Sequence, residues 1–282
     1  MIEARKFIAV DGLQTAYYGA GSGPTVVLLH SGEFGGCAEL TWEFNFHALA
    51  AEFHVVAPDW LGCGGSEKVH DFVLGYRRKL LHMRRFLEVM GIGAADFIGS
   101  SMGGALAVRA LAAEPDFFAA RSLTLIGAGG FAPDNEHRRA LLEYDCSIEA
   151  MRRIVVALFH GSAWADDEAY VRRRHTASIE PGVWECAAAA RFKNPLFPPR
   201  PDFGQADETP YENLACPVLV IGGACDKLKD PGYGDELGRK LRNGEVHILP
   251  ESGHMPNIER ASEVNALLID FLKRVHAADS GL

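Results

Sequence analysis

Short apolar runs recur along the chain, and they constrain its fold more than any other feature of the sequence. Runs of this kind are typical of strands buried on both faces, as in a parallel sheet. Helical spacing of apolar residues, by three and four positions, occurs at 76–90 and again at 264–275. The alternation predicts an α/β protein with helices on both faces of its sheet. The expected strands are residues 25–29, 53–57, 96–98, 122–126, 218–221 and 245–249.

The N-terminal segment predicts a hairpin in front of this alternation. Two strand-like runs, residues 7–10 and 13–18, flank Asp11 and Gly12. Asp-Gly between two such runs is a strong signal for a two-residue turn. We therefore expect two antiparallel strands before the first buried one.

The alternation stops between about Gly129 and Asn213, where no convincing strand occurs. This region holds helical stretches and a proline-rich segment at residues 194–201. We expect a helical insertion, so that residues 1–128 and 213–282 form the core and residues 129–212 form a cap or lid. Insertions of this kind commonly cover a site at the carboxyl edge of a sheet. A long excursion with no part in the site is the alternative.

Composition and charge exclude several classes of function. The 282 residues are 48% hydrophobic and carry a net charge of −9, which argues against broad binding of nucleic acid or an anionic membrane. No run reaches the ~18 apolar residues of a spanning helix, and the N-terminus lacks the features of a signal peptide. The six cysteines show no CxxC or CxxH grouping, so we expect reduced thiols in a cytoplasmic protein. Neither HExxH nor GxxxxGK[ST] occurs, so no metal or cofactor is expected.

The segment Gly99-Ser100-Ser101-Met102-Gly103 follows an expected strand and precedes a helix rich in small residues. Strand, GxSxG and helix together indicate a nucleophile elbow, in which the central serine sits on a strained turn above the sheet. The flanking glycines give the clearance that lets strand and helix approach each other. We predict that Ser101 is a nucleophile.

A serine hydroxyl needs a base to remove its proton and an acid to orient that base. In elbow proteins the order along the chain is serine, acid, histidine. Asp226 and His254 each follow an expected strand, so both emerge at the same sheet edge as Ser101. We predict His254 as the base and Asp226 as the orienting acid, with Asp230 as the alternative acid. His247 lies inside a strand and is expected to be a packing or edge residue.

A tetrahedral intermediate requires two hydrogen-bond donors aimed at its oxyanion. The N–H group of Met102, directly after the nucleophile, is one expected donor. The second should come from the loop after residues 25–29, and we predict the Gly32 N–H group, with Glu33 or Phe34 as alternatives.

With these motifs in this order, the sequence resembles the α/β-hydrolase fold family over essentially its whole length. Residues 30–32 (HSG) are similar to the family's oxyanion loop, and residues 59–66 (DWLGCGGS) to its Asp-x-x-Gly-x-Gly-x-Ser segment. The resemblance implies a mostly parallel eight-stranded sheet, an inserted helical cap, and hydrolysis of a small-molecule substrate. A homodimer is also compatible with it.

Within that family the chain looks most like the meta-cleavage-product hydrolases, which break carbon–carbon bonds in ring-opened aromatic catabolites. Residues 127–130 (GAGG) are similar to their Gly-Pro-Gly-Gly, and residues 174–182 (RHTASIEPG) to a cap segment of their semialdehyde-hydrolysing members. The resemblance implies that Arg174 binds the carboxylate and dienol oxygens of a 2-hydroxy-6-oxo-dienoate. A guanidinium suits that role because it is permanently charged and offers a planar fork of donors. A solvated face at residues 172–174 is the alternative.

Three sites depart from the pattern of those enzymes. Ser100 stands where they usually carry Asn, Met255 where they carry Trp, and Glu33-Phe34 where they commonly carry Gly-Pro. These changes touch the substrate pocket, so Ser100, Met255 and Phe34 are predicted substrate-binding residues. Carbon–carbon hydrolysis is the favoured function. A carboxylesterase or lactonase would use the same triad, and a non-catalytic small-molecule receptor is a third alternative.

Overall fold

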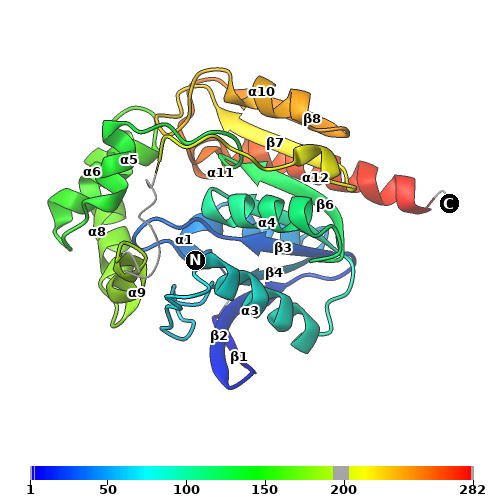
Figure 1. Cartoon of the computed structure of the whole chain (residues 1–282), viewed down its shortest axis with the longest axis horizontal. Coiled ribbons are helices and arrows are strands. Elements are labelled where there is room, and N and C mark those ends of the chain that lie inside the picture. The colour runs from blue at the N-terminus through cyan, green and yellow to red at the C-terminus, as the bar shows by residue number, and fades with distance from the viewer. Residues whose placement is uncertain (1, 3, 193–202, 281–282) are drawn as a thin grey trace.

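An eight-stranded sheet forms the centre of the computed structural model, which describes residues 2, 4–192 and 203–280. Its strand order is β1-β2-β4-β3-β5-β6-β7-β8 (Figure 1). Only β2 runs antiparallel to its neighbours; the other neighbouring strands pair in parallel. The strands are β1 (Lys6–Val10), β2 (Leu13–Ala20), β3 (Thr25–Leu29), β4 (His54–Pro58), β5 (Ala95–Ser100), β6 (Ala120–Ile126), β7 (Val218–Gly223) and β8 (Gly244–Leu249).

Each strand expected from the sequence is present, and the N-terminal hairpin is confirmed. Asp11 and Gly12 join β1 to β2 with φ angles of 50° and 83°. Two positive φ angles are what a two-residue turn requires if its twist is to match that of the flanking strands. The expected fold class, a mostly parallel sheet of eight strands, is therefore correct.

Successive residues of a strand point to opposite faces of the sheet. Because apolar residues of the strands point to both faces, helices cover both. Val27 and Leu29 of β3 face a core that is shared with α3, α4 and α10, whereas Val26 and Leu28 face a core that is shared with α1, α2 and α12. In the described residues, no helix is both long and apolar enough to span a membrane. The helices and short helical segments that accompany the sheet are α1 (Ala38–Trp42), α2 (Phe46–Ala50), α3 (Tyr76–Val89), α4 (Met102–Ala113), η1 (Tyr211–Asn213), α10 (Tyr233–Lys240), α11 (Pro256–Glu259) and α12 (Ala261–Ser280).

A second group of helices lies between β6 and β7 in the sequence, and Figure 1 shows it beyond one end of the sheet. That end is the carboxyl end of the parallel strands, since β6 leads directly into α5. The group has its own apolar core, to which Phe34 and Met255 of the sheet domain also contribute. The expected proline-rich segment at residues 194–201 lies outside the described residues. The inserted helices are α5 (Glu136–Leu142), α6 (Ile148–Leu158), α7 (Ala163–Asp166), α8 (Glu168–Ser178) and α9 (Val183–Ala189).

Candidate active site

Ser101 occupies the turn between β5 and α4, with φ 48° and ψ −113°. A non-glycine residue in this region carries backbone strain of about 1–3 kcal/mol, which persists only where the surroundings hold it. Here the Ser101 N–H group donates to the Ile126 carbonyl at 2.8 Å, and the Ser101 carbonyl accepts from the Ala105 N–H group at 2.9 Å. Ser101 is partly exposed and lies at the carboxyl end of β5.

Three glycines make this turn possible through close backbone approach. A Cβ atom on Gly99 would lie 2.4 Å from the Gly104 backbone, and one on Gly103 would lie 2.2 Å from the Leu29 carbonyl oxygen. A Cβ atom on Gly104 would lie 2.5 Å from the Ala128 Cβ. A larger residue at any of these positions would push α4 away from the sheet and move Ser101.

The structure brings Ser101, His254 and Asp226 together in one hydrogen-bonded chain. His254 Nε2 lies 2.8 Å from Ser101 Oγ, and His254 Nδ1 lies 2.8 Å from Asp226 Oδ2. The His254 and Asp226 side chains are each 1% exposed. The Leu228 N–H group donates to Asp226 Oδ1 at 2.8 Å, so both carboxylate oxygens have partners.

Electrostatics keeps Asp226 ionised despite its burial. Burial on its own would raise the pKa of this carboxyl, but the interactions with His254 and the Leu228 N–H group outweigh it and leave the pKa below its ordinary value. The alternative acid, Asp230, is exposed. His247 lies in β8 and pairs with Glu245 at 2.7 Å, outside this chain of contacts.

The His254 backbone is held by the inserted helices, a feature that sequence reasoning missed. Its N–H group donates to the Leu158 carbonyl at the end of α6, at 2.8 Å. Glu259 joins the same two segments, because its carboxylate accepts from the Gly253 N–H group and from the His160 N–H group, each at 2.6 Å. The position of the imidazole therefore depends on where α6 ends.

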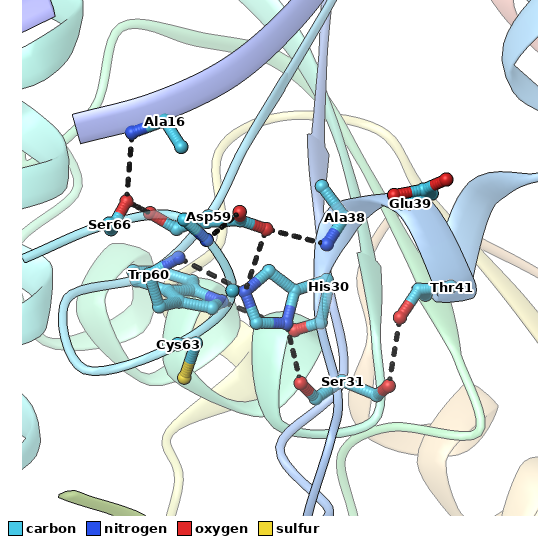
Figure 2. A network of polar contacts seen from close by, with 12 residues as sticks. Ala16, His30, Ser31, Ala38, Glu39, Thr41, Asp59, Trp60, Cys63 and Ser66 are labelled. Carbon is cyan, nitrogen blue, oxygen red and sulfur yellow. Dashed lines mark hydrogen bonds and ion pairs between the residues drawn. The ribbon is translucent and has the colours of Figure 1, made fainter. Parts of the chain in front are cut away.

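The loop after β3 lies against the elbow and is fixed by the network in Figure 2. A Cβ atom on Gly32 would lie 2.5 Å from Met102 Sδ, so these two predicted oxyanion positions are in contact. Asp59 anchors the network: its carboxylate accepts from the Ala38 N–H group at 2.7 Å (Figure 2). It also accepts from the Gly65 N–H group at 2.8 Å. The motif at residues 59–66 thus supports this loop.

His30 connects the network to the loop through both ring nitrogens. The Trp60 N–H group donates to Nε2 at 3.0 Å, so Nδ1 carries the proton and donates to the Ser31 carbonyl at 2.6 Å (Figure 2). Burial lowers the pKa of His30, although Asp59 opposes the shift, so the ring is neutral. In a trans peptide the C=O and N–H bonds point in opposite directions. The Gly32 N–H group therefore points away from His30.

Arg174 of α8 reaches this loop and is fully buried. Its Nη1 lies 2.7 Å from Glu33 Oε1, in an ion pair whose side chains are 0% and 3% exposed, and its Nε donates to the Tyr170 hydroxyl at 2.9 Å. The neighbouring arginines behave differently: Arg172 pairs within its own helix and Arg173 pairs with Glu43, and both are about half exposed or more. The expected alternative of a solvated face thus holds for the neighbours but not for Arg174.

The other predicted pocket residues lie where the inserted helices meet the sheet domain. Phe34 is 4% exposed, and its ring centroid lies 4.7 Å from that of Tyr144. Met255 is fully buried, and the Ser100 hydroxyl donates to its sulfur at 3.8 Å. These side chains therefore pack at the junction above the elbow. Within the described residues, no group of three or more His, Cys, Asp or Glu side chains could hold a metal ion.

The sheet order, together with the strained serine between β5 and α4, defines the α/β hydrolase class. The comparison with protein families agrees: the model of the alpha/beta hydrolase family matches residues 26–267. The chain belongs to this family and is a hydrolase.

Curated relatives match over nearly the whole chain. A 2-hydroxymuconate semialdehyde hydrolase from Pseudomonas sp. (strain CF600) is 30% identical, with 98% of this chain and 96% of the relative covered. A 2-hydroxy-6-oxo-6-(2'-aminophenyl)hexa-2,4-dienoic acid hydrolase from Metapseudomonas resinovorans is 28% identical, with 95% and 91% covered. Among solved structures, a meta-cleavage product hydrolase from Pseudomonas fluorescens IP01 superposes with a TM-score of 0.83 at 26% identity, covering 95% of this chain and 97% of that one.

Proposed function

We propose that this chain is a serine hydrolase that cleaves a carbon–carbon bond next to the 6-oxo group of a 2-hydroxy-6-oxo-dienoate. The observation that carries the proposal is the hydrogen-bonded chain from Ser101 Oγ through His254 to Asp226, with 2.8 Å at each link. The names of the curated relatives support the substrate class, since they act on 2-hydroxymuconate semialdehyde and related dienoic acids.

In the first half-reaction Ser101 Oγ bonds to the carbonyl carbon while His254 takes the hydroxyl proton. Asp226 holds the imidazole in the required tautomer and stabilises its charged form. The substrate reacts as its 2-oxo tautomer, in which the proton of the 2-hydroxyl group has moved to C5. The C5–C6 bond then breaks, its electron pair passes through the C3=C4 double bond to the 2-oxo oxygen, and His254 returns the proton to that oxygen. Water, deprotonated by His254, next releases the carboxylic acid and restores the serine. Direct attack by a His254-activated water is the alternative first step and gives the same products.

The oxyanion would be stabilised by the N–H groups of Met102 and Gly32. The contact between these residues supports the pairing. Met102 opens α4, where the helix leaves its first N–H groups without partners inside the helix. His30 holds the Ser31 carbonyl on the opposite side of the peptide, which directs the Gly32 N–H group away from the His30 network.

The inserted helices would act as a cap over this site, with the boundaries expected from the sequence at residues 129–212. Phe34, Ser100 and Met255 would form the pocket wall beneath the cap, since they lie at its junction with the sheet domain. Arg174 would contribute the cap's polar contact to the substrate. A cytoplasmic location and assembly as a homodimer remain predictions from the sequence.

A carboxylesterase or lactonase is the second candidate, because the ion pair with Glu33 removes the net charge that would favour a carboxylate at Arg174. A non-catalytic receptor remains the third. The same triad would serve an ester, with an alkoxide as leaving group in place of a carbanion.

To test the proposal, purified protein is mixed with a yellow 2-hydroxy-6-oxo-dienoate, whose colour is lost on cleavage. The same protein is assayed in parallel with short p-nitrophenyl esters. We expect bleaching, with losses of at least about 10³-fold in Ser101→Ala and His254→Ala. His247→Ala is the matched control, since this half-buried histidine lies outside the triad, and it should keep full activity. Ester turnover without bleaching would favour the esterase. Ligand affinity unchanged in Ser101→Ala, with no turnover of either substrate, would favour the receptor.

A further inference from the structure

The ion pair between Glu33 and Arg174 joins the two halves of the candidate site. Glu33 directly follows Gly32 in the oxyanion loop, and Arg174 comes from α8 among the inserted helices. The sequence offers the Glu33 N–H group only as an alternative oxyanion donor, and neither the sequence nor the comparisons give the Glu33 carboxylate a role. This buried carboxylate is hydrogen-bonded to Nη1 of Arg174 and supplies the negative charge that an anionic group of a substrate would otherwise bring.

The guanidinium contacts two segments that adjoin the candidate site. On one side its Nη1 contacts Glu33, one residue after Gly32. On another side its carbon lies 5.6 Å from the ring centroid of Phe159, the residue that follows the carbonyl bonded to the His254 backbone. Arg174 is therefore placed between the oxyanion loop and the segment that supports the catalytic histidine.

Among the described residues, one nitrogen of the Arg174 guanidinium has no hydrogen-bond partner. Nε donates to Tyr170 and Nη1 to Glu33, whereas Nη2 is buried and contacts no acceptor in this part of the chain. An unsatisfied buried donor is costly, and in a native protein it calls for an explanation such as a missing ligand. Burial would raise the pKa of Glu33, but the charge of Arg174 outweighs it and leaves the pKa lowered, so both groups are ionised and the pair is neutral.

We propose that Glu33 is a specificity-determining residue: by neutralising Arg174 it makes the cap side of the pocket select an uncharged oxygen, bound by Arg174 Nη2, over a carboxylate. The inference rests on the proposed function, and it assigns the dienol or keto oxygen of the substrate, rather than its carboxylate, to Arg174. A neutral acyl chain with an oxygen at this position would be accepted equally well.

The experiment compares variants that differ in the charge of residues 33 and 174, each assayed with two matched esters. The p-nitrophenyl half-ester of adipic acid carries its carboxylate at the same chain distance from the reacting carbonyl as a 6-oxo-hexadienoate, and its methyl ester is the neutral counterpart. The readout is the ratio of kcat/KM for the acid to kcat/KM for the methyl ester. Glu33→Gln leaves the positive charge of Arg174 uncompensated, and Arg174→Gln leaves the negative charge of Glu33 uncompensated. The double variant is neutral, like the native pair.

We expect the ratio to rise at least about tenfold in Glu33→Gln and to fall at least about tenfold in Arg174→Gln, because one uncompensated charge acts strongly in a buried site. The double variant should return to within about threefold of the native ratio, since charge and not shape sets it. Arg173→Gln is the matched control, because this exposed arginine pairs with Glu43, and its ratio should equal the native one.

A different pattern overturns the proposal. If Arg174 binds the substrate carboxylate while Glu33 moves aside, the native protein will show a high ratio of acid to methyl ester, and Glu33→Gln will change that ratio little. Arg174→Gln and the double variant will then lower the ratio to the same extent. Should Glu33→Gln fail to fold, the comparison of native protein with the double variant still decides, because only the proposal expects equal ratios. Absence of dienoate bleaching together with the expected ester series would reject carbon–carbon cleavage and leave this inference standing.

Discussion

Replacing His30 by alanine tests the structural account of the oxyanion loop most directly. The imidazole is fully buried, donates to the Ser31 carbonyl at 2.6 Å and accepts from the Trp60 N–H group at 3.0 Å. His30→Ala removes both hydrogen bonds and leaves two buried backbone groups without partners. The Gly32 N–H group survives, but the Ser31–Gly32 peptide loses the hydrogen bond that fixes its direction.

The expected magnitudes follow from these contacts. Each orphaned backbone group costs about 1–3 kcal/mol, so the free energy of unfolding should fall by about 3–5 kcal/mol. Complete loss of one oxyanion donor lowers kcat by about 10²–10³-fold. A donor that is present but loosely aimed should cost less, about 10–100-fold in kcat. KM should change less than about threefold, because the oxyanion exists only in the transition state.

The assay compares kcat, KM and inhibition by a boronic acid, which forms a tetrahedral adduct on the serine. In folded His30→Ala, the inhibition constant should rise by the same factor as kcat falls. His30→Gln should recover part of both, because an amide supplies one donor and one acceptor. Unchanged kcat in a folded variant, or a loss that appears wholly in KM, would refute the reasoning.

Three further changes test other parts of the structure. Asp226→Asn should lower kcat by about 10³–10⁴-fold at unchanged Tm, because an amide no longer selects the tautomer of His254 that the reaction needs; activity near the native level would exclude Asp226 as the orienting acid. Gly104→Ala should destabilise the protein by about 2–4 kcal/mol in chemical unfolding, since its Cβ atom would overlap the Ala128 Cβ at 2.5 Å. Burial lowers the pKa of His82 to about 4, so only the unfolded chain binds this proton between pH 6.5 and 4. Stability should therefore fall by about 3 kcal/mol on acidification through that range, and His82→Gln should flatten the decline; parallel curves would contradict this assignment.

The sheet could be predicted from sequence because its strands are short, apolar and bounded by turn residues. Such runs carry their own boundaries, and the observed strand ends differ from the expected ones by only a few residues. The convergence of Ser101, Asp226 and His254 followed from the same information. Each residue lies in the turn or loop that follows a parallel strand, and the carboxyl ends of parallel strands meet at one edge of the sheet.

Contacts between the sheet domain and the inserted helices could not be predicted in this way. The hydrogen bond from His254 to the Leu158 carbonyl joins segments about a third of the chain apart, and a backbone carbonyl leaves no mark in a sequence. The sequence gives no sign of the role of Glu259 either, since a glutamate in a short helix near the surface is common. Burial of this carboxylate, which raises its pKa, becomes visible only once α6 is placed beside it.

Glu33 and Phe34 did leave a signal, because they stand where the enzymes that this chain resembles commonly carry Gly-Pro. Both side chains reach the inserted helices, Glu33 by its ion pair with Arg174 and Phe34 by its ring contact with Tyr144. A glycine and a proline could make neither contact. The two departures therefore act together, because both connect the loop after β3 to the inserted helices. A movement of α8 would displace Glu33, the residue next to Gly32. Under the proposed function, one buried ion pair joins the part of the site that would stabilise the transition state to the part that would select the substrate, and a change in either residue should alter both.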